Sequence, residues 1–405
     1  MSTTFAVPAS YLRHAIRALP SRIAPAVAPS EMPLRQRRPY SSKDATKSSF
    51  TYRLAAAAAG KRTASRAPKL DRDFWLYTST QANATPPYLR STKPNSGEDA
   101  FFAATVGGSQ HHVAFGVADG VGGWQDQGVD PSEFSHGLCG LMGGTAYIHE
   151  GLEAGKNVRP QQLMQTAYEA VMANPRIMAG GCTASLAVVD GAGGMEMANL
   201  GDSGFLVLSP GKVAHRSQIQ THAFNTPFQL SKVPPKMQAQ NAIFGGSAHF
   251  SETPAQADVE EYQLKHGDIV LFATDGVWDN LSAQDTLGVV AKVMQEHGYW
   301  FKSHKTPGAE ALLNESLVRA IPKRVDGKEA ERYLPGLLAT AVMREAKIAG
   351  LDTRRNGPFA KEVNLHYPQE GWRGGKPDDI AVVVCVAVED AEAASEDQRP
   401  IKAKL

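Results

Sequence analysis

Two aspartates in this chain occupy nearly the same sequence context, and each stands where a buried strand is expected to end. Asp119 lies in the sequence VADGV and Asp275 in ATDGV. The apolar runs before them, residues 113–118 and 269–274, predict short strands in a core. A carboxylate at such a strand end has little freedom to move. The glycine after it lets the backbone turn and brings a bare carbonyl group close to whatever the carboxylate binds.

Two further acidic pairs extend this pattern. The pair Glu98-Asp99 comes just before a short apolar run, and Asp378-Asp379 directly precedes the apolar run 380–388. An isolated Asp-Gly usually marks only a turn. Two such motifs with matching flanks, together with two acidic pairs beside apolar runs, instead favour a shared cation site. Hard cations such as Mg²⁺ and Mn²⁺ prefer the oxygen atoms of carboxylates, carbonyls and water.

Strand-like and helix-like stretches alternate in blocks, and hairpin-like strand pairs around 191–194 and 210–211 favour antiparallel sheets. The pattern predicts an α+β fold with two sheets packed face to face and helices outside. The expected strands are 103–106, 113–118, 183–189, 195–200, 205–208, 269–272 and 380–388. The expected helices are 132–150, 160–172, 283–296, 309–320 and 336–349.

The chemistry-bearing motifs follow one another as Glu98-Asp99, GVADGVGGW (116–124), GCTA (181–184), NLGDS (199–203), ATDGVWD (273–279) and GKPDDI (375–380). In this order, over roughly residues 95–390, they resemble the metal-dependent type 2C (PPM) protein serine/threonine phosphatases. The GVGGW variant is similar to the mitochondrial branch of that family, whose members are tied to coenzyme Q biosynthesis and mitochondrial protein dephosphorylation. The resemblance implies a four-layer αββα sandwich, which agrees with the strand and helix pattern.

The resemblance also implies a site for two Mg²⁺ or Mn²⁺ ions. Asp119 is expected to bridge the ions, and catalysis is expected to depend on Asp119, Asp275 and Asp378. Two close divalent ions would lower the pKa of a water between them and neutralise the phosphoryl oxygens. The implied metal ligands are Glu98, Asp99 (through water), Asp119, Gly120 (through its carbonyl oxygen), Asp275 and Asp378.

Asp202 and Asp279 match positions that bind a weaker third ion in parts of the family. Asp202 lies in the turn sequence GDSG, so capping of that turn is an equally strong alternative for it. Asp379 stands where the family usually has asparagine. Its carboxylate is expected either to accept hydrogen bonds from groups behind the metal ligands or to change the metal affinity.

Two positions depart from the family pattern. Val121 stands where many members have a histidine proposed to protonate the leaving alkoxide. The weak replacement candidates are His111, His112 and His136. The family's phosphate-binding arginine is also missing, and the nearest basic residues, Arg90 and Lys93, are the candidate phosphate ligands although neither has the matching spacing.

Two irregular segments adjoin these motifs. The polar segment 223–250 predicts a flap over the active site, in which Gln229-Leu230 and 244–246 either contact substrate or pack. The segment 350–374 contains arginines and aromatic residues. We expect it either to recruit an acidic or phosphorylated partner or to be a solvated surface loop, and we favour the loop.

The N-terminus is rich in arginine and poor in acid. Leu12, Ile16 and Leu19 share one helical face while Arg13 and Arg17 fall on another, the signature of a mitochondrial presequence. The sequence RPYS predicts cleavage between Tyr40 and Ser41. The resulting domain plan is a presequence (1–40), a flexible linker (41–72), a catalytic domain (73–392) and a polar tail (393–405). A disordered basic tail is the alternative for the first segment.

Composition narrows the class of protein. A formal net charge of +1 gives no indication of a nucleic-acid partner. Cys139, Cys182 and Cys385 lie far apart, which disfavours a zinc knuckle or a disulfide framework and suits a reducing compartment. No apolar run is long enough to cross a bilayer, so we expect no membrane span. We also expect the protein to be a monomer.

The sequence therefore predicts a metal-dependent phosphatase that hydrolyses phosphoserine and phosphothreonine on mitochondrial matrix proteins by attack of an activated water. Two alternatives stay open: a phosphatase-like binding module that has lost catalysis, and a small-molecule phosphomonoesterase.

Overall fold

The computed structural model describes residues 50–61, 76–77, 96–150, 157–235, 237, 239, 250–302, 311–314, 317 and 333–389. The chain divides into two units, Met1–Ala45 and Thr46–Leu405, and all of the described residues belong to the second. The expected presequence (1–40) and polar tail (393–405) lie outside the described residues.

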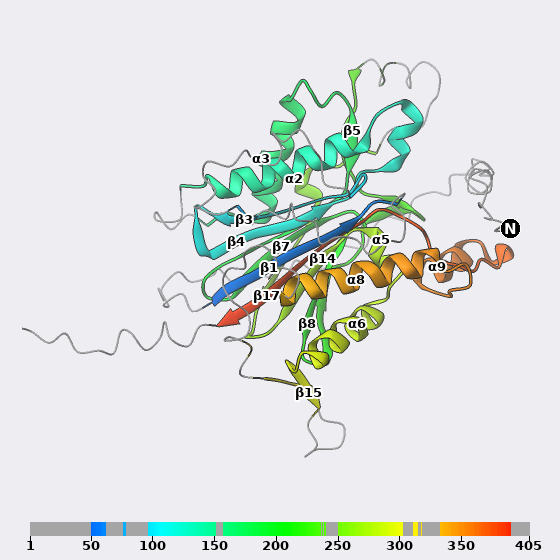
Figure 1. Cartoon of the computed structure of the whole chain (residues 1–405). Helices are drawn as coiled ribbons and strands as arrows, with labels where there is room; N and C mark the ends of the chain where they lie inside the picture. The colour runs from blue at the N-terminus through cyan, green and yellow to red at the C-terminus, as the bar shows by residue number, and fades with distance from the viewer. Residues whose placement is uncertain are drawn as a thin grey trace, which may run out of the picture. The chain divides into compact units, whose positions relative to one another are not determined.

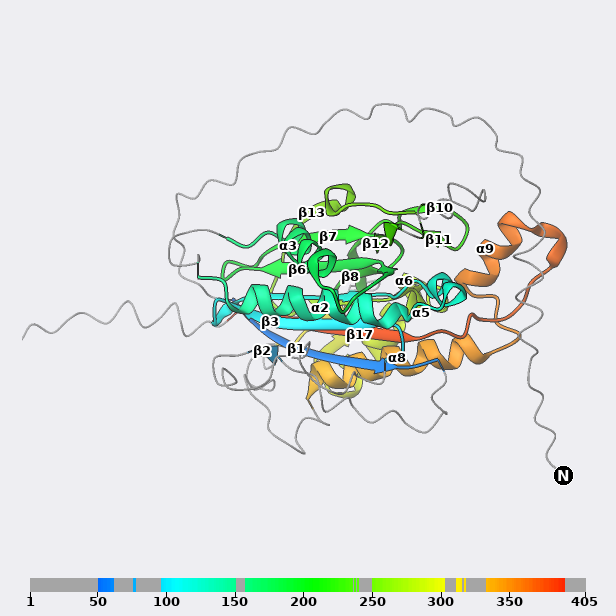
Figure 2. The same ribbon diagram turned by 90° about the horizontal axis from the view of Figure 1, so that it is seen from above.

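Two sheets form the centre of this unit and helices cover their outer faces (Figure 1). The first sheet has the strand order β13 (Asp258–Gln263), β7 (Gly194–Leu200), β6 (Ala184–Val189), β4 (Ser109–Ala118), β3 (Ala100–Val106) and β2 (Leu76–Tyr77). The second has the order β1 (Phe50–Ala59), β17 (Ile380–Glu389), β14 (Ile269–Ala273), β8 (Gly204–Ser209) and β9 (Lys212–Arg216). Helices α2 (Pro131–Tyr147) and α3 (Pro160–Ala173) pack on the first sheet, and α6 (Ala283–Glu296) and α8 (Leu334–Leu351) on the second. The view from above shows the same layers (Figure 2), and the predicted αββα architecture is confirmed.

Strand β17 explains why this sequence gives buried sheets. Its side chains alternate between two cores: Ile380, Val382 and Val384 pack with α6 and α8, whereas Ala381 and Val383 face the other sheet. Because both faces are covered, the strand reads as one continuous apolar run rather than as an alternating pattern. A third core fills the space between the first sheet and helices α2 and α3.

Local signals begin the helices. The Asp130 side chain accepts a hydrogen bond from the Ser132 amide at the start of α2, with Pro131 at the first helical position. Ser282 and Asp285 form a reciprocal capping box at the start of α6.

The prediction of a flexible linker over 41–72 is wrong for residues 50–59. These residues form β1, which pairs along its whole length with β17 and is buried throughout. The alanine run looks like low-complexity linker because it has no large apolar side chain, but its small side chains fit against α8. The folded unit therefore includes a strand that precedes the predicted domain boundary at residue 73.

The predicted helix at 309–320 is also wrong at its start. Residues Ala311–Leu313 form β16, which pairs with β15 (Trp300–Lys302). Four short strands lie beside the sheets, β5 (Gly180–Cys182), β10 (Thr221–Ala223), β11 (Thr226–Pro227) and β12 (Leu230–Lys232). The described residues also form the helix α5 (Asp275–Trp278), the helix α9 (Pro358–His366) and the 3-10 helices η3 (Gly122–Gln127), η4 (Pro254–Gln256) and η6 (Pro368–Glu370).

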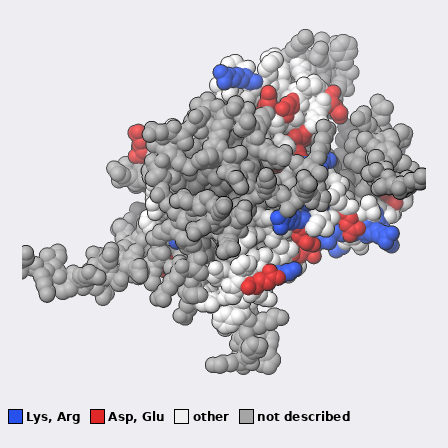
Figure 3. Space-filling view, viewed as in Figure 1, with Lys and Arg blue, Asp and Glu red and all other residues white. Residues whose placement is uncertain are grey.

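Acidic and basic side chains intermingle over the part of the surface that Figure 3 shows in colour. Within the described ranges, no helix has the length and apolar character needed to span a membrane.

Candidate metal centre

The sheet topology gathers the predicted acidic residues at one edge. Antiparallel neighbours place the end of one strand beside the start of the next: Ala118 at the end of β4 pairs with Ala100 at the start of β3. In the second sheet, Ala273 at the end of β14 likewise pairs with Val382 near the start of β17. Asp119, Asp99, Asp275 and Asp378 therefore leave their strands at the same edge of the sandwich.

Asp119 is held through its backbone by the GCTA segment. Its amide donates to the Thr183 hydroxyl at 3.2 Å, and the Thr183 amide donates to its carbonyl oxygen at 2.9 Å. The Thr183 hydroxyl is also 2.7 Å from that of Ser203, which lies beside Asp202. This network gives the GCTA motif a positioning role at the carboxylate end of β4.

The glycines of the two Asp-Gly motifs allow close backbone approach. A Cβ atom on Gly120 would lie 2.7 Å from the Glu98 carbonyl oxygen, and one on Gly276 would lie 2.0 Å from the Asp379 carbonyl oxygen. Each glycine thus lets an acidic pair pack directly against an Asp-Gly turn.

Asp99 and Glu98 join the site from the start of β3. Asp99 is 1% exposed, and its Oδ2 accepts a hydrogen bond of 2.7 Å from the Thr274 hydroxyl. The Glu98 carbonyl oxygen accepts hydrogen bonds from the Gly120 amide and from the Ser135 hydroxyl on α2. The Glu98 side chain accepts one from Gln125.

Asp379 braces this edge of the site. Its Oδ2 accepts the Glu98 amide at 2.9 Å, and its Oδ1 accepts the amide of Lys61, just beyond the end of β1. A carboxylate offers a separate oxygen to each of these two backbone donors, whereas an asparagine in the same position would turn its NH2 group toward one of them. The aspartate at this position is therefore a positioning residue matched to β1.

Crowding of these carboxylates raises their pKa values. Burial, and then the charges of neighbouring aspartates, raise the pKa of Asp99, Asp119 and Asp202 well above the usual range. Burial and the charge of Asp275 raise the pKa of Asp378. Burial, Asp379 and Asp378 raise the pKa of Glu98 to about 7.

The ammonium group of Lys376 opposes this negative charge. The Lys376 ammonium lies 2.6 Å from Asp275 Oδ2 and 2.7 Å from Asp279 Oδ2. Burial works to raise the pKa of Asp275, but Lys376 and a hydrogen bond from Asp119 hold it below the usual range. Burial raises the pKa of Asp279 to about 7 against the pull of Lys376. Lys376 was not identified from the sequence as part of the site. The GKP sequence just before Asp378 was the feature that could have indicated a lysine close to the acidic residues.

The residues fit divalent ions in their chemistry. Clustered oxygen donors with raised pKa values are costly to ionise unless a cation lies among them. As the side chains stand, no three acidic, histidine or cysteine groups of the described residues converge on a single ion position.

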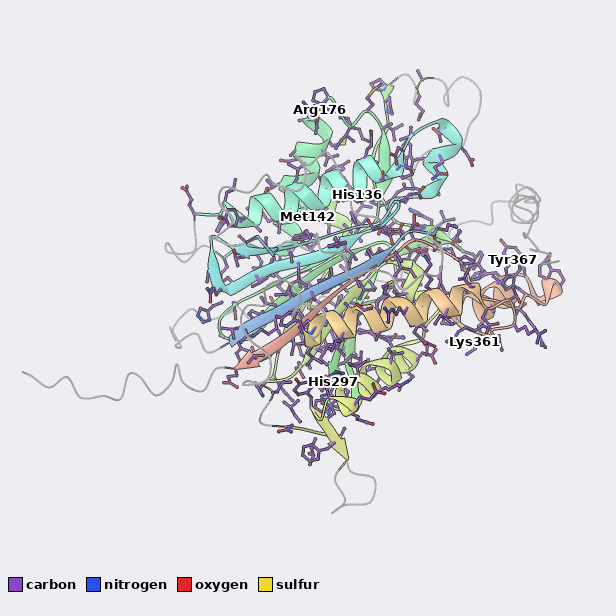
Figure 4. All side chains as sticks on the ribbon, in the orientation of Figure 1. His136, Met142, Arg176, His297, Lys361 and Tyr367 are labelled. Carbon is purple, nitrogen blue, oxygen red and sulfur yellow. The ribbon has the colours of Figure 1, made fainter. Side chains whose placement is uncertain are left out.

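The three candidate histidines lie at different distances from the acidic residues. His111 contacts the Phe50 carbonyl oxygen and His112 the Ser109 hydroxyl, both in the half of β4 farther from Asp119. Seven or more residues of extended strand span about 23 Å, so neither ring reaches the carboxylates. His136 lies on α2 (Figure 4), with Nε2 3.4 Å from the Gly97 carbonyl oxygen beside Glu98. Arg90 and Lys93 lie outside the described residues.

The base of the expected flap is packed beside the site. Gln229 is 8% exposed and accepts a hydrogen bond of 3.1 Å from the indole of Trp124, while Leu230 is fully buried. These two residues pack rather than face substrate, whereas 244–246 lie outside the described residues. The ring of His222, just before the flap, stacks against the rings of Phe228 and Phe250.

Most residues of the segment 350–374 are exposed, as a solvated loop predicts, but part of the segment is helical. It contains α9 and η6, and the ring of Phe224, in the turn between β10 and β11, contacts Phe359, His366 and Tyr367 there. Figure 4 labels Tyr367 beside the end of α9. The flap and α9 therefore share an aromatic contact.

Comparison with known proteins gives a consistent result. The chain is 34% identical over 299 residues to "Protein phosphatase PTC7 homolog" of Xenopus laevis, which covers 72% of this chain and 82% of that protein. It is 30% identical over 338 residues to "Protein phosphatase 2C homolog 7, mitochondrial" of Saccharomyces cerevisiae, covering 83% and 82%. The solved structure of the photosystem II phosphatase PBCP aligns with a TM-score of 0.52 at 22% identity, covering 83% of this chain and 98% of that one, and supports the fold. The chain matches no protein-family model.

Proposed function

Because the chain belongs to the type 2C (PP2C) family of protein phosphatases, within its PTC7 group, we propose that it hydrolyses phosphoserine and phosphothreonine in mitochondrial phosphoproteins with two bound divalent ions, Mg²⁺ or Mn²⁺. The observation that carries this proposal is the set of buried carboxylates at one sheet edge. The paired ends of β3, β4, β14 and β17 bring Asp99, Asp119, Asp275 and Asp378 to this edge, and Asp99 accepts a hydrogen bond from Thr274, directly before Asp275.

In this proposal the residues that would hold the ions are Asp119, Asp275, Asp378 and Glu98 through their carboxylates, Asp99 through water and Gly120 through its carbonyl oxygen. The bound ions would activate a water and offset the phosphoryl charge. The protein's own residues fix the ligands: Thr183 holds the backbone of Asp119, Thr274 orients Asp99, and Asp379 holds the backbone of Glu98.

The experiment is hydrolysis of a phosphothreonine peptide and of p-nitrophenyl phosphate by the full chain with Mn²⁺, with Mg²⁺ and with EDTA. We expect turnover that either metal supports and that EDTA or Asp275→Asn removes. A folded protein without turnover in either metal would contradict the proposal and favour the binding-module alternative. Turnover of small phosphomonoesters alone would favour the small-molecule alternative.

We propose Arg90 and Lys93 as the residues that bind the substrate phosphate, because the guanidinium of Arg90 offers a bidentate fork. Arg90→Ala is expected to raise KM for the phosphopeptide by about tenfold or more, the loss of one charge-assisted contact. An unchanged KM in both Arg90→Ala and Lys93→Ala would remove them from the site.

We propose the mitochondrial matrix as the location of the protein. The arginine-rich start and the name of the yeast relative support it. N-terminal sequencing of the protein recovered from mitochondria should begin at Ser41. A mature protein that still begins at Met1 would contradict both the cleavage site and the import route.

A further inference from the structure

Lys376 places an ammonium group inside the acidic site. Its Nζ atom lies 2.6 Å from Asp275, 2.7 Å from Asp279 and 3.3 Å from Asp378, and its side chain is 17% exposed. Three carboxylates at salt-bridge distance form a strongly negative cradle around one ammonium group.

The backbone of Lys376 is fixed by a buried amide. The Asn280 side chain, in a residue that is 1% exposed, accepts the Lys376 amide at 2.9 Å and donates to the Lys376 carbonyl oxygen at 2.8 Å. The same Asn280 amide also donates to the carbonyl oxygen of Gly276 at 2.9 Å. The lysine is thereby tied to the Asp275 turn.

An aromatic ring completes the surroundings of the ammonium group. Nζ lies 5.8 Å from the centre of the Phe359 ring, whose negative face attracts cations. Phe359 is itself held beside the acidic cluster, since its amide donates to the Asp279 carbonyl oxygen. Three carboxylates at salt-bridge distance favour the charged ammonium form of this side chain.

We propose that the ammonium group of Lys376 is the resident cation on the Asp279 side of the metal centre, so that Asp279 binds lysine and is not a ligand of a divalent ion. This inference rests on the proposed function, because it assumes that divalent ions bind at the Asp119 side. It replaces the expectation of a third ion at Asp279. The chain itself carries the positive charge there, and the centre needs fewer ions to offset its carboxylates.

The first test counts ions rather than turnover. The full chain and Lys376→Met are dialysed against saturating Mn²⁺, and bound manganese is measured by mass spectrometry. Met keeps an apolar stem of similar length but leaves the Asp279 side without a cation, so the variant should bind about one more Mn²⁺ per chain than the wild type. An equal count in the two proteins would overturn the proposal.

Lys61→Met is the matched control. Lys61 also lies 3.4 Å from Asp378, but its side chain is 55% exposed. Its removal should leave the manganese count unchanged. A gain as large as that of Lys376→Met would show that any lost charge recruits an ion, and would overturn the specific role of Lys376.

Asp279→Asn gives a second test that holds even if Lys376→Met fails to fold. With Lys376 in place, the proposal predicts the wild-type manganese count and an Mn²⁺ affinity within about twofold of the wild type. Loss of an ion, or a tenfold weaker affinity, would make Asp279 a metal ligand and overturn the inference. A wild-type chain that binds no Mn²⁺ would overturn the proposed metal dependence as well, whereas absent turnover with normal Mn²⁺ binding would affect only the proposed activity.

Discussion

Individual residues of the acidic cluster differ in what they touch, and this decides what each substitution does. Thr183 holds the backbone of Asp119, and the Asp119 side chain interacts with Asp275. Asp119→Asn should lower kcat/KM more than about 100-fold, because the expected bridging charge is lost. It should leave the melting temperature in EDTA within a few degrees of the wild type, since the asparagine amide has a similar size and can still donate to Asp275. Wild-type turnover in this variant would remove Asp119 from the metal centre.

Asp379 tests whether the bracing residues matter. Asp379→Asn keeps one acceptor for the two amides of Glu98 and Lys61, so one of them loses its partner. An unsatisfied amide costs about 1–3 kcal/mol. We expect a lower melting temperature and about tenfold weaker Mn²⁺ binding, measured by calorimetry. Asp126→Asn, at an exposed site, is the control, and identical behaviour of the two variants would contradict the bracing role.

At the scale of elements, β1 is the strand that the sequence concealed. It covers the edge of β17, contributes Phe50, Tyr52 and Leu54 to the core between the sheets, and ends beside Asp379. Its alanine run carries no β-branched residue, so the strand forms only because it packs against β17 and α8. Both elements lie more than 270 positions later in the sequence.

Truncation separates β1 from the residues before it. Deletion of 1–40 should leave thermal stability and activity unchanged, because β1 remains whole. Deletion of 1–60 should leave the chain unfolded or insoluble, because β17 becomes an open edge with an exposed core. Circular dichroism and thermal melting measure both, and equal melting temperatures would contradict the role of β1.

For the whole molecule, the acidic centre makes stability depend on pH when no metal is bound. The folded-state pKa values of Glu98 and Asp279 are raised from 4.5 and 3.8 to about 7. Protonation is thus favoured in the folded state, and the stabilisation is full below about pH 4 and is lost as the pH rises through 7. In EDTA the melting temperature should fall between pH 5 and 8, by about 2 °C for each kcal/mol lost. Mn²⁺ should reverse the fall, and a metal-free melting temperature that rises over this range would contradict the account.

The sequence allowed prediction of the sheets and of the acidic motifs because both are local patterns. Asp119 and Asp275 end apolar runs, and β17 shows its double burial in its composition. The role of Lys376 could not be predicted, because its contact with Asp279 depends on how α5 meets the start of β17. The α9 contact with Phe224 was hidden for the same reason: it joins segments that are distant along the chain.

The central claim is that these carboxylates form the metal centre. Anomalous diffraction at the manganese edge, from crystals of the full chain grown with Mn²⁺, tests it most directly. The account predicts two peaks, one among Asp119, Asp275 and Asp378 and one on the side of Glu98 and Gly120, with none between Lys376 and Asp279. Crystals of active protein with no peak beside Asp119 would contradict it.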